Sequence, residues 1–190
     1  MRRAASEFTA ILDDVDARES SDEVAAARAG DPMPYIRMQW GDGLLLDDWQ
    51  EEFLRYTFDP SIAEVFVKGN TGCGKGFSTA IAVCVYVAIW DDAKVIISRD
   101  NHPNAVKVAF GEVAKWWRKM AHPPPGASLL TSGIKFLQDS QRFVFVANPD
   151  TEEGFHGHHA NHVCFWLDEA TSPPLEERYQ ALRTQATTLI

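Results

Sequence analysis

The feature that most restricts the fold is a glycine-rich turn set between two apolar runs, at residues 65–78. Gly69, Gly74 and Lys75 match the pattern G-x-x-x-x-G-K-[ST], and Gly76 stands where that pattern has Ser or Thr. Glycines allow such a turn to curl until several backbone N–H groups and a helix N-terminus point at one anion. The segment therefore predicts an apolar strand at 65–67, a phosphate-binding loop and a buried helix from 76 to 90.

The loop would supply the ligands of a nucleotide, with Lys75 reaching the outer phosphates as a point charge. Gly76 lacks the hydroxyl that normally contacts Mg²⁺. Ser78 faces away at about 100° per residue and Thr79 lies roughly one turn further on, so neither replaces it cleanly. An ordinary glycine turn between a strand and a helix is the alternative. The residues expected to bind nucleotide are Gly69, Asn70, Thr71, Gly72, Cys73, Gly74, Lys75, Gly76 and Phe77.

A second motif is the apolar run at 163–167, which ends in Asp168 and Glu169. Such a run is typical of a parallel strand buried on both faces, and ligands of open α/β sheets bind at the carboxyl ends of these strands. We expect Asp168 to hold Mg²⁺, directly or through water, and Glu169 to orient or deprotonate the attacking water. The alternative is that both carboxylates cap a following helix near Pro173. The acidic pair favours hydrolysis, although a P-loop kinase stays open.

The remaining pattern predicts an α/β fold in which strands and helices alternate. A helix at 48–56 precedes the loop, and a strand at 94–98 and a helix at 101–120 follow it. Runs at 134–137 and 142–147 predict an inserted hairpin. We expect a P-loop NTPase of the additional-strand, catalytic-glutamate type, with a mostly parallel sheet covered by helices on both faces. Residues 46–190 would form this domain, and residues 1–45 an acidic arm or helical extension, with a capping box at 20–23 starting a short helix that ends at Gly30.

Two further segments carry a family resemblance. The segment Gly154-Phe155-His156-Gly157, which leads into the acidic strand, and the element Asp48-Trp49-Gln50 resemble parts of the ATPase domain of the large terminase subunit of tailed bacteriophages. The resemblance implies an ATP- and Mg²⁺-dependent motor that drives viral double-stranded DNA into procapsids. It implies a homo-oligomeric ring that works with a small terminase subunit and a portal protein in the host cytoplasm. It also makes Gln50 a candidate for recognising adenine, with a plain helix-start glutamine as the alternative.

The chain departs from that family at two positions. One is Gly76, and the other is His156, where many terminases have an arginine that resembles a finger inserted into a neighbouring subunit. Because the reference pKa of histidine is about 6.5, it carries little positive charge at neutral pH. Arg99 and Arg142 are the other candidates for stabilising charge. The chain also ends in a run that predicts another core strand, so we expect an N-terminal fragment without a nuclease domain that either hydrolyses ATP or only binds it.

Composition sets further limits. The net charge of −9 argues against a freestanding nucleic-acid binder, and the densest basic run, Lys107 to Lys119, is either a DNA-facing patch or a solvated helix face. The longest apolar run is too short to span a bilayer, and no signal peptide is evident, so we expect neither membrane insertion nor secretion. The histidines and cysteine at 156–164 are a candidate zinc cluster, but a second ligand pair is missing. Cys73 lies in the loop, and we expect ATP to protect it from alkylation.

Overall fold

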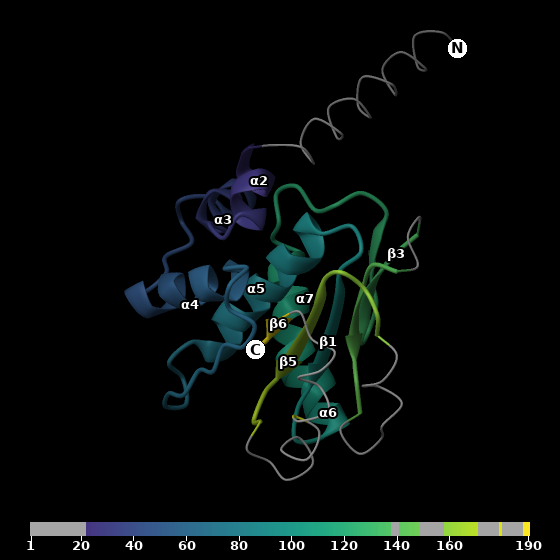
Figure 1. Cartoon of the computed structure of the whole chain (residues 1–190). Coiled ribbons are helices and arrows are strands. Elements are labelled where there is room, and N and C mark those ends of the chain that lie inside the picture. Colours follow the sequence, from purple (N-terminus) through teal and green to yellow (C-terminus); the bar gives the residue numbers. More distant parts are fainter. Residues whose placement is uncertain (1–21, 138–140, 149–157, 171–178, 180–187) are drawn as a thin grey trace, which may run out of the picture.

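The computed structural model describes residues 22–137, 141–148, 158–170, 179 and 188–190. An open mixed sheet with helices packed against it forms the centre of the molecule (Figure 1), with strand order β2-β3-β4-β1-β5-β6. The strands are β1 (Lys94–Ser98), β2 (Ala127–Leu129), β3 (Gly133–Phe136), β4 (Phe143–Val146), β5 (Val163–Leu167) and β6 (Thr188–Leu189).

Strand direction divides this sheet into two parts. Strand β1 pairs in parallel with both β4 and β5, and β5 pairs in parallel with β6. Strands β2, β3 and β4 pair antiparallel in sequence order. The α/β class and the inserted hairpin, now β3 and β4, are confirmed. The expectation of a mostly parallel sheet is wrong, because the insertion adds a third strand, β2, and a second antiparallel ladder.

The two central strands are built for burial. Every residue of β1 and β5 is buried, as the continuous apolar runs predicted. Successive side chains point to opposite faces. Val95 and Ile97 therefore join the large core that contains the helices, whereas Ile96 and Phe165 form a smaller cluster on the other face. Among the described residues, helices cover the first face; Ala160, Ala170 and Tyr179 pack against the second. We predicted helices on both faces of the sheet, and the described helices cover only one of them.

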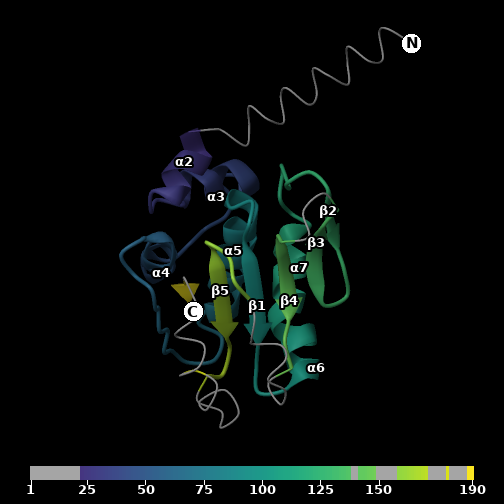
Figure 2. The same ribbon diagram turned by 45° about the vertical axis from the view of Figure 1, so that its right-hand side comes forward.

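The helix after the glycine-rich turn is the hub of the helical layer (Figure 2). It is apolar all round and almost fully buried, as a helix between a sheet and other helices should be. The helices are α2 (Asp22–Arg28), α3 (Met33–Trp40), α4 (Asp48–Phe58), α5 (Lys75–Ile89), α6 (His102–Asn104), the π-helical turn η1 (Ala105–Phe110) and α7 (Gly111–Trp117).

The N-terminal helices belong to the same core. Val24 and Ala27 of α2 and Ile36 of α3 are buried in the cluster that contains α5, so residues 22–40 pack directly on the candidate ATPase domain. Helix α4 begins with a capping box in which the side-chain oxygen Oε1 of Gln50 accepts the backbone N–H of Asp47 at 2.9 Å.

The run before the glycine-rich turn differs from its prediction. Residues 65–67 form no strand within the described residues; only Glu64 makes a β-bridge, and Phe66 is 70% exposed. Strand β6 occupies the position next to β5. A strand at 65–67 would therefore have to pair with the other side of β6, and the described part of β6 is only two residues long. The expected strand at the chain end is confirmed, because β6 pairs with β5 in parallel.

Candidate functional site

The glycine-rich turn ends in a helix N-terminus whose backbone donors are open. Gly72 and Gly74 adopt left-handed φ angles of 84° and 93°, which glycine takes without strain. Within the described residues, Cys73 is the only residue from Asn70 to Phe77 whose backbone N–H has a protein acceptor, the carbonyl of Asn70 at 3.4 Å. The remaining N–H groups of the turn and the positive end of the α5 dipole are free to meet an anion.

Lys75 lies over this turn rather than in bulk solvent. Its ammonium group donates to the carbonyls of Gly69 at 2.6 Å and Asn70 at 3.1 Å, and lies 3.8 Å from the sulfur of Cys73. Among the described residues, all of its hydrogen-bond partners belong to its own loop. A phosphate at the mouth of the turn would therefore exchange these carbonyl contacts for a charged partner, which makes a stronger hydrogen bond.

The helix offers no hydroxyl to the turn. Ser78 donates to the carbonyl of Gly74 at 3.1 Å and Thr79 to that of Lys75 at 3.0 Å, so both side chains bond back along the helix. Both are buried. Gly76 is exposed, and a side chain added there would meet nothing within 4 Å. The prediction that neither hydroxyl replaces the missing one agrees with this geometry.

Gln50 lies against the turn, but its carbonyl is occupied. A β-carbon at Gly74 would lie 2.5 Å from the side-chain nitrogen of Gln50 and 3.8 Å from the ring of Trp49. The carbonyl oxygen of Gln50 closes the α4 capping box, and the residue is only 5% exposed. The structure therefore gives Gln50 a structural contact beside the cradle, and adenine recognition stays a prediction.

The acidic pair sits where β5 ends at the carboxyl edge of the sheet. The backbone N–H of Asp168 still donates to Ser98 of β1 at 2.9 Å, and the chain then turns at Glu169, whose φ of 60° is left-handed. That conformation costs a non-glycine residue about 1–2 kcal/mol. Such strain is found disproportionately at functional positions. It turns the backbone immediately after Asp168.

Arg99 connects the two carboxylates. It follows the last residue of β1, and its guanidinium lies 3.0 Å from Asp168 and 3.5 Å from Glu169, with a third contact of 3.1 Å to Asp100. Arg99 is 19% exposed, Asp168 25% and Glu169 59%. The pair is thus half inside the protein, with Glu169 on the solvent side.

The charges around Asp168 link it to the glycine-rich turn. Burial raises the pKa of Asp168 above its ordinary value, Arg99 opposes this, and the neighbouring Glu169 raises it further. The ammonium group of Lys75 also lowers the pKa of Asp168. This attraction indicates that the turn and the acidic pair lie in the same part of the molecule.

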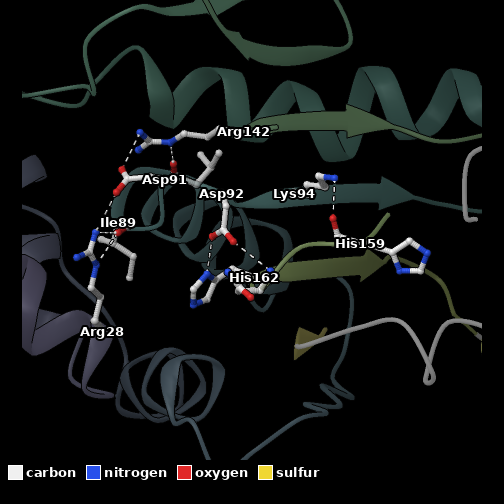
Figure 3. Close-up of polar contacts among 10 residues, drawn as sticks. Arg28, Ile89, Asp91, Asp92, Lys94, Arg142, His159 and His162 are labelled. Carbon is white, nitrogen blue, oxygen red and sulfur yellow. Dashed lines mark hydrogen bonds and ion pairs between the residues drawn. The ribbon is translucent and has the colours of Figure 1, made fainter. Parts of the chain in front are cut away.

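Three predicted site residues lie elsewhere. The ring of Phe77 packs edge-on against Trp116, with centroids 5.0 Å apart, so only its backbone faces the turn. Arg142 lies away from this site: it is buried at the opposite end of α5, beside Asp91 (Figure 3). There it donates to the carbonyls of Val87 at 2.8 Å and Ala88 at 2.7 Å. His156 lies outside the described residues.

Comparison with known proteins adds no relative. No protein-family model and no curated protein matches this sequence. No helix in the described part of the chain is long and apolar enough to cross a membrane. The same residues contain no group of three or more His, Cys, Asp or Glu side chains placed to hold a metal, so the zinc alternative gains no support from His158, His159, His162 and Cys164.

Sequence reasoning missed that Arg99 bridges the acidic pair. The signal was available in the strand ends: Arg99 and Asp168 each follow an apolar run directly, and parallel neighbours with matched registers place such residues side by side. The left-handed Glu169 had no sequence signal, because glutamate is not a residue that prefers this conformation.

Proposed function

We propose that this chain binds ATP at the turn of residues 69–76 and hydrolyses it with the help of Asp168 and Glu169. The observation that carries the proposal is the turn itself, whose open backbone N–H groups and Lys75 stand at the N-terminus of α5. Lys75 also lowers the pKa of Asp168, which supports an acidic pair in the neighbourhood of this turn. An ordinary glycine turn requires neither open N–H groups over a helix N-terminus nor an acidic pair beside them.

Each group of the site has a role that follows from its position. The open N–H groups and Lys75 bind the phosphates, and Glu169, the most exposed of the charged groups, accepts a proton from or orients the attacking water. Arg99 is placed to move its charge from the carboxylates to the phosphates as a ligand enters. This gives stabilising charge within the same chain and makes Arg99 a better candidate than Arg142.

The donor set fits magnesium. Mg²⁺ in nucleotide sites is bound by one or two carboxylates together with phosphate oxygens and waters, and Asp168 supplies such a carboxylate. When bound, Mg²⁺ neutralises the phosphate oxygens. Gly76 has no hydroxyl to coordinate Mg²⁺. Asp168 would therefore contribute more of the affinity for Mg²⁺ than it would beside a loop with Ser or Thr at this position.

We also propose the finer assignment to the additional-strand, catalytic-glutamate class of P-loop NTPases and, within it, to the ATPase domain of a large terminase. Three features support it: β1 follows the turn in sequence yet lies beside the acidic strand, a catalytic-type glutamate ends that strand, and β6 occupies the position next to it. The link to viral DNA packaging rests on the resemblance of residues 48–50 and 154–157.

A binding module without turnover is the second candidate. It is favoured by Gly76 and by the ion pairs of Arg99, which occupy both carboxylates. A fragment of this kind would bind ATP and release no phosphate.

Steady-state phosphate release from ATP and Mg²⁺ separates the candidates. The enzyme predicts turnover that falls by about 100-fold or more in Glu169→Gln, with ATP binding retained. Binding without release supports the module. ADP formation that depends on an added nucleoside monophosphate supports a P-loop kinase, and absence of ATP binding refutes all three.

A further inference from the structure

The guanidinium of Arg99 contacts three carboxylates, and one of them lies outside the acidic pair. Its terminal nitrogens face Asp168 at 3.0 Å and Glu169 at 3.5 Å, and its Nε lies 3.1 Å from Asp100. The contact with Asp100 is also a hydrogen bond. Because a guanidinium is planar and rigid, a fixed Nε determines where the two terminal nitrogens point. The Asp100 contact therefore sets the orientation in which Arg99 faces the acidic pair.

Asp100 is held in place by residues at the start of α6. The side-chain amides of Asn101 and Asn104 donate to its Oδ2 at 2.9 Å and 3.2 Å, whereas Arg99 donates to its Oδ1. The backbone N–H of Asn104 donates in turn to the side chain of Asn101 at 2.9 Å, which orders both asparagines. The position of Asp100 thus has support that is independent of Arg99, as an anchor for that arginine requires.

Arg99 and a divalent cation compete for the same carboxylates. Oxygen ligands of Asp168 and Glu169 that are paired with a guanidinium have to release it before they coordinate a metal. An arginine that is already ordered loses less side-chain entropy when it forms these pairs. By ordering Arg99, Asp100 therefore increases the fraction of molecules in which the acidic pair is occupied.

We propose that Asp100 is a positioning residue that holds Arg99 over the acidic pair and keeps divalent cations from it until a nucleotide is bound. The proposal rests on the ATPase function proposed above and names a regulation of that site. Asp100 sets the resting state, and the negative charge of entering phosphates supplies the competing attraction for Arg99.

The test measures Mn²⁺ binding to the full chain without nucleotide, by electron paramagnetic resonance, because Mn²⁺ prefers the same oxygen ligands as Mg²⁺. Asp100→Asn should tighten Mn²⁺ binding about threefold or more, the effect of losing one charged hydrogen bond to Arg99. The change of charge alone predicts the opposite sign, since removing a nearby carboxylate weakens cation binding. Asp22→Asn is the matched control. It makes the same change on the exposed side of α2, whose Arg28 contacts the far end of α5, and should have no measurable effect.

Two further variants show whether Asp100 acts through Arg99. Asn104→Ala leaves every charge in place and removes one amide that holds Asp100, so it should tighten Mn²⁺ binding in the same direction but by less than Asp100→Asn. In an Arg99→Ala background, Asp100→Asn should no longer tighten Mn²⁺ binding, because the residue that it positions is gone.

Unchanged or weaker Mn²⁺ binding by Asp100→Asn, in a variant that melts at the native temperature, refutes the proposal. Tightening that persists without Arg99 refutes it as well, and so does undetectable Mn²⁺ binding by Asp100→Asn, which should expose both carboxylates. If Asp100→Asn melts lower, Asn104→Ala decides by the same sign. Phosphate release tests the ATPase separately: no release, with both Mn²⁺ effects present, would refute the ATPase and leave the hold of Asp100 on Arg99 standing.

Discussion

The two ends of helix α5 differ in whether protein side chains satisfy their backbone hydrogen-bonding groups. At its C-terminal end, Arg28 and Arg142 donate to the carbonyls of Ile89, Val87 and Ala88, and both guanidiniums contact Asp91 (Figure 3). At its N-terminal end, the turn leaves most of its backbone N–H groups open, and among the described residues the hydrogen bonds of Lys75 stay within that turn.

We infer from this difference that the C-terminal end of α5 contributes to stability and the N-terminal end to ligand binding. Cations at a helix C-terminus satisfy its orphan carbonyls and its dipole, so the protein itself completes that end. The N-terminal end would be completed in the same sense by an anion, and no carboxylate among the described residues accepts the N–H groups of this turn. We infer that α5 is anchored at one end so that the other can present open donors to a ligand.

The largest expected effect compares the two ends directly. Lys75→Ala should weaken ATP binding on the order of 100-fold, because it removes a charged hydrogen-bond donor to phosphate, and should change the free energy of unfolding by less than about 0.5 kcal/mol. Arg142→Met should lower the free energy of unfolding by about 3 kcal/mol, because it leaves buried carbonyls without donors, and should leave ATP affinity within about twofold. Fluorescent ATP-analogue titration and urea unfolding measure both.

The opposite pattern of effects would contradict this division between the two helix ends. If Lys75→Ala unfolded the protein, the lysine contacts to its loop would be structural and the open-ended description of the turn would be wrong. If Arg142→Met abolished ATP binding at unchanged stability, the C-terminal end would belong to the functional machinery.

Two glycines of the same helix end sharpen the comparison. Gly74→Ala should destabilise the fold by about 2 kcal/mol, since φ is 93° and the new β-carbon would lie 2.5 Å from Gln50. Moving Gln50 also breaks the α4 capping box. Gly76→Ala meets nothing within 4 Å and should stabilise the helix by about 0.5–1 kcal/mol. Thermal melting distinguishes them, and destabilisation by Gly76→Ala would show that this position is not helical.

Much of the site was predictable because its parts are local. The glycine turn, the apolar helix and the apolar run ending in Asp168 and Glu169 each depend on neighbouring residues, and the structure forms the turn, the helix and the strand close to their expected bounds. The alternation of Ile134 to Leu137 and Arg142 to Ala147 likewise predicted β3 and β4. Such signals survive because backbone geometry and burial act within a few residues.

What failed depended on long-range pairing. Strand β2 is three residues long, partly buried and preceded by prolines, which is too weak a pattern to predict. Arg142 was offered as a charge for the site, but β4 runs parallel to β1 with Lys94 opposite Phe143, so Arg142 lies at the amino edge of the sheet. Arg99 follows β1 and lies at the carboxyl edge. The position of each arginine relative to its strand, before β4 for Arg142 and after β1 for Arg99, decides at which edge of the sheet it lies.

Alkylation of Cys73 is a milder test of the open end. Its side chain is partly exposed within the turn, whereas Cys84 and Cys164 are buried, and burial raises the pKa of the Cys164 thiol to about 12. A thiol reagent should therefore label Cys73 alone in the native chain. ATP and Mg²⁺ at ten times the dissociation constant should slow labelling about tenfold. Equal rates with and without nucleotide, measured by mass spectrometry, would count against the cradle.

The smallest effect lies beyond the C-terminal end of α5, at Asp92. Its carboxylate contacts the ring of His162 at 2.6 Å (Figure 3). It also accepts the backbone N–H of Asn161 at 3.0 Å, and the ring of His162 stacks on Trp90 with centroids 3.7 Å apart. Partial burial raises the pKa of Asp92, but the hydrogen bonds from His162 and Asn161 outweigh it and hold the pKa below its usual 3.8.

A carboxylate whose pKa is lowered by folding stabilises the fold above its unfolded pKa, and that contribution is lost as pH falls through the folded value. Asp92→Asn should therefore lower stability by less than about 1 kcal/mol at neutral pH, because the side chain is 33% exposed and solvent screens its interactions. The gap between native chain and variant should be constant above about pH 5 and close below the usual pKa of 3.8. A gap that persisted at pH 2.5 in thermal melts would mean that Asp92 acts through packing, and the anchored end would then depend on Arg28 and Arg142 alone.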